Sequence, residues 1–216
     1  MTNQVLPRSC RSDCIKRLTN CAGLRRGEPR YNAFTLIELI LVVGIIMVLA
    51  GLVLTTVGYA RKKGARARAE TEIAAMSAAC ENYKADNGIY PRDSTAYTDT
   101  LNARQDFDAT NTVYRNASFY LYTQLSGDSS GSRSPTGKSY MVFKPNMLFP
   151  ADQTQNVQYI QDPFGNIYGY STANQADPTT PKGYNPTFDL WSTAGVAPSP
   201  TPNPPATQQD LWIKNW

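Results

Sequence analysis

The chain has 216 residues, with 21 basic and 17 acidic side chains and no histidine. The absence of histidine excludes Ser-His-Asp and Cys-His catalysis, a histidine-ligated zinc site and a histidine pH switch. A hydrophobic content of 41% is enough for one modest folded core and excludes disorder throughout.

The first 33 residues form a basic leader. They hold seven Lys and Arg side chains against two acids, a pattern that is typical of a cytoplasmic flank of a membrane segment. Cys10, Cys14 and Cys21 also lie in this leader, and their spacing matches no common zinc site.

An uncharged stretch of 22 residues, Leu39 to Ala60, lies between Glu38 and Arg61. At the helical rise it covers about 33 Å, one hydrocarbon thickness. We therefore predict a membrane-spanning helix; the alternative is a buried core helix, which is usually shorter and amphipathic. A second basic cluster extends from Arg61 to Arg68, so charge counting alone leaves the orientation open.

The string Ala33-Phe34-Thr35-Leu36-Ile37-Glu38 separates the leader from the apolar stretch. It resembles the cleavage and methylation signature of type IV prepilins and type II secretion pseudopilins. The resemblance implies that a prepilin peptidase cuts between Ala33 and Phe34 and that the new Phe34 amine is methylated. The family usually has glycine at the position of Ala33. Removal of the leader leaves 14 basic and 15 acidic side chains, with Cys80 as the one cysteine, so the basic charge of the full chain does not indicate nucleic-acid binding.

Glu38 is an ionisable residue at the edge of an apolar helix, which marks it as a functional residue. In the family this glutamate neutralises the N-terminal amine of an adjacent subunit, so the resemblance assigns Glu38 to filament assembly. The alternative is an acid that stabilises its own helix dipole. Gly44, Gly51 and Gly58 recur every seven residues and indicate either close helix packing or the ordinary glycine tolerance of membrane helices.

The helix is predicted to continue to about residue 85, with one apolar stripe that packs against a head domain. Asn87-Gly88 and Pro91 end it. Residues 83–91 resemble the Y-K-x-D-N-G-x-Y-P junction of the major pseudopilins of type II secretion. The stripe comprises Ala69, Ile73, Met76, Cys80 (as a small core residue) and Tyr83, and the charged residues Arg66, Glu70, Glu72, Glu81 and Lys84 lie elsewhere around the helix.

Residues 92–216 predict a small head. Alternating runs at 140–144, 167–171 and 187–192 indicate strands of a small antiparallel sheet packed on the helix, whereas 119–125 fits either a helix or a strand. The loop 131–139 has some likeness to a phosphate-binding loop, but its glycine spacing is wrong and a proline interrupts it, so we do not predict a nucleotide site.

Three runs in the head also resemble the major pseudopilins: D-P-F-G-N-I-Y at 162–168, F-D-L-W-S at 188–192 and the terminal run 210–216, which ends in I-K-N-W. With the N-terminal signature they imply an α+β, type IV pilin-like fold, in which one long N-terminal helix, membrane-spanning in its first half, packs on a small antiparallel sheet. The predicted divisions are the cleaved leader 1–33, a membrane or filament-core helix 34–60, its continuation and cap 61–91, and the head 92–216.

In the family, a loop after the last strand commonly holds one calcium ion. The resemblance assigns Asp189, and with it Asp210, as candidate ligands, but Val196 stands where the family has its second aspartate, so any site should be weak. No cofactor is required. The proline-rich segment 198–205 is predicted as a solvated spacer, the alternative being a ligand for a proline-recognising partner.

The resemblance implies a structural, non-enzymatic subunit that polymerises into a periplasmic pseudopilus and drives type II secretion. The predicted location is the bacterial inner membrane, crossed once, with the head in the periplasm. One alternative is a type IV pilus subunit for adhesion, motility or DNA uptake; another is a membrane-anchored enzyme or binding module, although the acids of the head are scattered among turn residues without a dyad. The predicted partners are further copies of the chain, the prepilin peptidase and methyltransferase, the inner-membrane assembly platform, minor pseudopilins and membrane lipid, with no nucleic acid.

Overall fold

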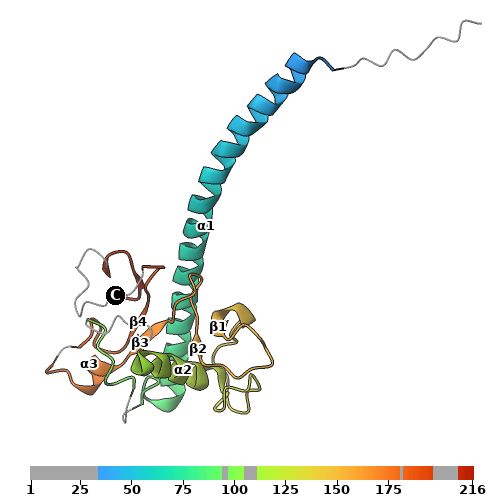
Figure 1. Ribbon diagram of the computed structural model, residues 1–216. Coiled ribbons are helices and arrows are strands. Elements are labelled where there is room, and N and C mark those ends of the chain that lie inside the picture. Colours follow the sequence, from blue (N-terminus) through green and yellow to red (C-terminus); the bar gives the residue numbers. More distant parts are fainter. Residues whose placement is uncertain (1–33, 94–96, 105–110, 181, 197–208) are drawn as a thin grey trace, which may run out of the picture. The chain divides into compact units, whose positions relative to one another are not determined.

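The computed structural model describes residues 34–93, 97–104, 111–180, 182–196 and 209–216. The chain divides into two compact units, Met1–Gly51 and Leu52–Trp216. The fold class is α+β, as predicted: a long N-terminal helix is followed by a second helix and small antiparallel sheets (Figure 1). The elements are α1 (Leu36–Asn87), α2 (Thr112–Ser126), the 3-10 turn η1 (Pro145–Met147), β1 (Leu148–Phe149), β2 (Tyr159–Ile160), β3 (Gly169–Ser171), α3 (Ala173–Ala176), β4 (Asp189–Ser192) and β5 (Ile213–Lys214).

The helix α1 is continuous over 52 residues. It ends where the sequence predicts, because Gly88 takes a left-handed conformation (φ of 80°) that few other residues adopt readily. The Gly88 amide donates to the Lys84 carbonyl oxygen at 2.7 Å and so satisfies one of the last carbonyls of the helix.

The predicted apolar stripe of α1 is confirmed. Ala69, Ile73, Met76 and Cys80 are buried, and Tyr83 is partly buried at the edge of the same core cluster. Burial raises the pKa of the Cys80 thiol, so Cys80 is an inert core residue. The other side of this core comes from residues far along the chain, including Leu121 of α2, Tyr170 of β3 and Leu190 of β4.

Glu72 differs from the expectation that the charged residues of α1 lie away from the core, because it is buried. Its carboxylate accepts a hydrogen bond from Arg68 Nε at 2.6 Å and another from the Tyr168 hydroxyl at 2.8 Å. A buried carboxylate is tolerated when it is paired and hydrogen-bonded in this way. Helical spacing is consistent with this burial, since Glu72 lies three residues after Ala69 and four before Met76, whereas its partner Tyr168 reaches it only through the tertiary fold.

Residues 119–125 are helical, as part of α2, which settles the choice that the sequence left open. The Asn111 side chain accepts a hydrogen bond from the Val113 amide at 2.9 Å and caps the start of α2, while Gly127, with φ of 74°, caps its end. The buried face of α2 includes Tyr114, Leu121 and Leu125.

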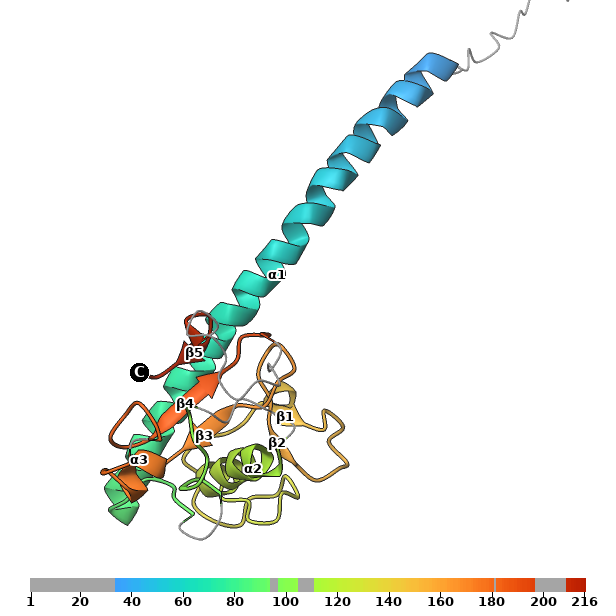
Figure 2. The ribbon, with the colours of Figure 1, turned by 60° about the vertical axis from the view of Figure 1, so that its left-hand side comes forward.

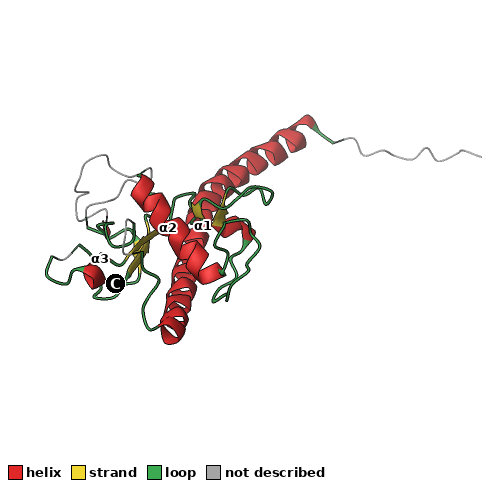
Figure 3. Ribbon diagram, turned by 90° about the horizontal axis from the view of Figure 1, so that it is seen from below, coloured by secondary structure: helices red, strands yellow, loops and turns green. Residues whose placement is uncertain are grey.

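The strands of the described residues form two antiparallel sheets, drawn in yellow in Figure 3. In the first, β1 pairs with β2, with Leu148 opposite Ile160. In the second, β4 lies between β3 and β5, with Tyr170 opposite Leu190 and Ser192 opposite Ile213. Figure 2 shows this second sheet beside the C-terminal part of α1. The strands predicted at 167–171 and 187–192 are confirmed with shorter bounds.

The strand predicted at residues 140–144 is wrong. The amides of Tyr140 and Met141 donate to the Leu125 carbonyl oxygen at the end of α2, at 2.8 and 3.0 Å, instead of to a neighbouring strand. Val142 is 87% exposed, so the alternation there does not mark a buried face. The strands β1 and β2 were missed because two residues are too few for a periodic pattern.

Candidate processing and assembly site

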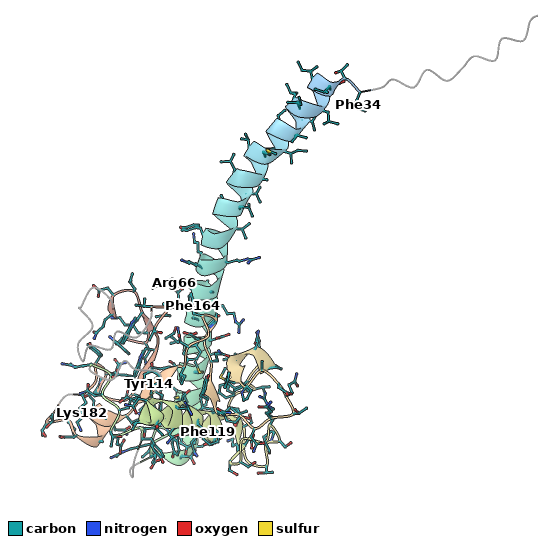
Figure 4. All side chains as sticks on the ribbon, in the orientation of Figure 1. Phe34, Arg66, Tyr114, Phe119, Phe164 and Lys182 are labelled. Atoms are coloured by element: carbon teal, nitrogen blue, oxygen red, sulfur yellow. The ribbon has the colours of Figure 1, made fainter. Side chains whose placement is uncertain are left out.

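The start of α1 holds the residues predicted for processing and assembly. Phe34 is exposed directly before the helix (Figure 4). Ala33, the other residue of the predicted cut, lies outside the described residues. Phe34 is thus left uncovered by the rest of the described chain.

Thr35 and Glu38 form a reciprocal cap at the first turn of α1. The Glu38 amide donates to Thr35 Oγ1 at 3.3 Å, while Glu38 Oε2 accepts from the Thr35 amide at 3.4 Å and from the Thr35 hydroxyl at 3.3 Å. This is the capping box of a Thr-x-x-Glu sequence. This role of Thr35 was not predicted, although the Thr-x-x-Glu spacing indicates it. The cap fixes the Glu38 carboxylate at the N-terminal turn, within one turn of Phe34.

The apolar part of α1 is exposed around its whole circumference. Its large side chains lie 37–76% exposed from Leu36 to Val57, and α1 is long and apolar enough to cross a membrane. Gly44, Gly51 and Gly58 have no heavy atom within 4 Å of an added Cβ, so they leave open surface for a neighbouring helix or for lipid. A surface of this kind requires an apolar environment that the described chain does not itself supply.

The runs of the head that resemble pseudopilins contact one another. The Asp162 carboxylate accepts hydrogen bonds from the Phe164 and Asn166 amides, at 2.9 and 2.8 Å, and from the Ser192 hydroxyl. Burial raises the pKa of Asp162 despite these bonds. The run at 162–168 is therefore tied to the last residue of β4.

The terminal run is tied to the same strand. Asn215 accepts from the Leu190 amide through Oδ1 at 2.9 Å and donates through Nδ2 to the Phe188 carbonyl oxygen at 3.3 Å. The Phe188 ring packs against Tyr90 at 5.0 Å between centroids, and the Tyr170 hydroxyl donates to the Pro91 carbonyl oxygen at 2.7 Å. The junction at 83–91, β3, β4 and the terminal run thus share one packed region.

One family model matches the chain, the prokaryotic N-terminal methylation motif, over residues 29–54. The match includes the predicted cut, the Thr35–Glu38 cap and the first part of the exposed apolar helix. The chain carries the N-terminal signature of type IV pilins and pseudopilins. This match supports a type IV pilin-like substrate of prepilin peptidase. No curated protein and no solved structure matches the chain.

The two candidate calcium ligands, Asp189 and Asp210, have different surroundings in the structure. Asp189 is buried, and its two carboxylate oxygens accept the amides of Asn185 and Tyr184, both at 2.8 Å. Burial raises the pKa of Asp189 in spite of these bonds and of the nearby Arg104 charge. Asp210 is exposed. In the parts of the chain that the structure describes, no group of three acidic or cysteine side chains is placed to hold a metal ion, whereas calcium takes six to eight oxygen ligands. The segment 198–205 lies outside those parts, and calcium binding stays a prediction.

The loop 131–139, which has some likeness to a phosphate-binding loop, donates backbone hydrogen bonds to the carboxylate of Asp128. Asp128 is buried and accepts the amides of Ser130 and Ser132, each at 3.2 Å, the amide of Arg133 at 2.7 Å and the Tyr122 hydroxyl at 2.9 Å. Lys138 pairs with Asp86. The amides of Ser130, Ser132 and Arg133 are therefore already occupied by the protein's own carboxylate and not by a bound anion.

We expect Asp128→Ala to lower the free energy of unfolding at pH 7 by about 2 kcal/mol, because the buried Tyr122 hydroxyl and three backbone amides of the loop lose their acceptor. Burial raises the pKa of Asp128, but the hydrogen bonds from Tyr122, Arg133 and Ser130 outweigh it, so the net pKa lies below its ordinary value of 3.8. A lowered pKa gives stability that is present above pH 3.8 and lost as the pH falls through the folded-state pKa. Urea unfolding of the full chain in detergent, followed by tryptophan fluorescence at pH 7 and pH 2, measures this difference.

Asp152→Ala is the control for this loop, because Asp152 is exposed and bonds only to its own turn. It should leave the unfolding midpoint nearly unchanged. An Asp128→Ala variant as stable as the wild type at pH 7 would show that the loop does not depend on this carboxylate.

Proposed function

We propose that the chain is a pseudopilin: a subunit that is processed, N-methylated and polymerised into a periplasmic filament driving type II secretion. The observation that favours a pseudopilin over a type IV pilus subunit is the contact between the head runs that resemble major pseudopilins. The Asp162–Ser192 bond and the Asn215 clamp on Leu190 join three such runs, which are far apart in sequence. Short chance matches have no reason to meet in one packed region.

The geometry supports a charge-neutralising role for Glu38. Cleavage before Phe34 creates an amine, and methylation leaves that amine positively charged. Burying this amine in an apolar filament core is costly unless an acid pairs with it. The Thr35–Glu38 cap keeps a carboxylate at the same level of the helix, where it can meet the amine of a neighbouring copy. The exposed apolar surface of α1 packs in lipid before assembly and against other copies afterwards.

Substitutions at Ala33, the residue before the predicted cut, test the proposed processing. We expect protein recovered from its own membranes to begin at Phe34 with one added methyl group, and Ala33→Leu to abolish cleavage because a bulky side chain replaces a small one. Peptide mass spectrometry of the N-terminus measures both. Ala33→Gly is the matched control and should be cleaved at least as well as the wild type. An N-terminus elsewhere in either the wild type or the control would contradict this assignment.

A deletion strain separates secretion from a surface pilus, since the N-terminal signature is common to both. Under the proposal, loss of the gene leaves exported proteins in the periplasm and does not change surface piliation. Immunoblots of periplasm and medium, with electron microscopy of the cell surface, distinguish the two. Loss of surface pili with normal secretion would instead identify a type IV pilus subunit.

A further inference from the structure

Three consecutive cations follow the apolar part of α1: Arg61, Lys62 and Lys63, here called the basic collar. All three are exposed. The next two cations along the helix are paired, Arg66 with Glu70 at 3.3 Å and Arg68 with Glu72 at 2.6 Å. Across the described residues, by contrast, the basic collar has no acidic partner, and no acid lies between Glu38 and Glu70 in the sequence.

The position of the basic collar matches the far edge of a bilayer. The 22 uncharged residues that separate Glu38 from Arg61 cover about 33 Å as a helix, so the collar emerges at headgroup level. Consecutive helical residues point about 100° apart, which spreads the three cations around the helix. Tyr59, 72% exposed, lies two residues before Arg61, and tyrosine is enriched at membrane interfaces.

We infer that the basic collar binds the phosphate groups of anionic phospholipids in the leaflet from which residue 61 emerges. Cations on the non-cytoplasmic side run against the usual charge asymmetry of membrane proteins, so they need a counter-charge there. Phosphate oxygens supply it, and the arginine fork fits them with two parallel hydrogen bonds. The collar thereby fixes the depth of α1 in the bilayer. The inference rests on the membrane position in the proposed function, but not on the type of filament.

The test uses the full-length chain in phosphatidylcholine nanodiscs that contain spin-labelled phosphatidylglycerol. Electron paramagnetic resonance gives the association of this lipid relative to phosphatidylcholine. We expect R61Q/K62Q/K63Q to lower the relative association about threefold, since each interfacial charge attracts anionic lipid and the basic leader retains part of the selectivity. The control R61K/K62R/K63R keeps all three charges and should match the wild type. High salt should reduce the difference between the variants.

Unchanged phosphatidylglycerol association in R61Q/K62Q/K63Q, with normal membrane insertion, would overturn this inference but would not contradict the proposed function. If that variant also lost cross-linking between copies, the collar would belong to a contact with a second subunit instead. Release of the wild-type chain from membranes by alkaline extraction would show that α1 does not span, and would overturn both the inference and the proposed function.

Discussion

Glu38→Ala is expected to abolish filament assembly while leaving cleavage and methylation intact. Without the carboxylate, the Phe34 amine of a neighbouring copy enters an apolar core uncompensated, which costs several kcal/mol and reduces assembly about a hundredfold. The measurement is the amount of subunit in sheared filaments, by immunoblot and electron microscopy, with mass spectrometry of the N-terminus to verify processing.

Glu38→Gln separates the two roles of this side chain. Glutamine can still accept from the Thr35 amide as the cap does, but it carries no charge. If charge pairing drives assembly, Glu38→Gln fails as Glu38→Ala does; normal assembly of Glu38→Gln would assign Glu38 to capping alone. Glu70→Ala removes an exposed acid of the same helix and should assemble normally, because surface pairs such as Arg66–Glu70 contribute little.

Gly169→Ala is expected to lower the free energy of unfolding of the head by about 3 kcal/mol. Gly169 is opposite Trp191 in the β3–β4 pair, and an added Cβ would lie 2.2 Å from Trp191 Cε2. Trp191 is fully buried, so the ring cannot move without displacing the surrounding core. Urea unfolding of the full chain in detergent, followed by tryptophan fluorescence, gives the change in free energy.

Gly64→Ala is the matched control, since nothing lies within 4 Å of its added Cβ and it sits within α1. Alanine favours helix over glycine, so this variant should be slightly more stable, by about 1 kcal/mol or less. Equal stability of Gly169→Ala and the wild type would mean that β3 and β4 separate easily at this point.

The long helix could be predicted from the sequence because its signals are local. The stripe from Ala69 to Cys80 repeats at helical spacing, and Gly88 ends the helix through a backbone conformation that glycine favours. Neither feature depends on distant residues, so both could be predicted from a few neighbouring positions in the sequence.

The head was less predictable because its polar contacts join distant residues. Tyr168 reaches Glu72 across 96 positions, and no spacing rule anticipates that bond. Residues 140–144 have an alternating pattern but form no strand. The Tyr140 amide donates to the Leu125 carbonyl oxygen and not to a neighbouring strand. Pattern alone does not decide which acceptor a backbone amide finds.

The candidate site was predicted for a different reason. Phe34 and Glu38 were found through a signature, which named residues but gave no geometry. The structure adds Thr35, whose hydroxyl and amide hold the Glu38 carboxylate. The Thr-x-x-Glu spacing was sufficient to predict this cap.

The clamp of Asn215 on β4 has a consequence for synthesis and export. Ribosomes deliver α1 first, yet the cover of the stripe that includes Met76 stays incomplete until Leu190 arrives, and the Leu190 amide lacks its acceptor until Asn215 follows. Contacts across so much sequence form slowly. Under the proposed membrane-spanning role, the apolar part of α1 enters the bilayer while the head is still incomplete, so the bilayer, and not the head, is the first stable environment of the nascent chain.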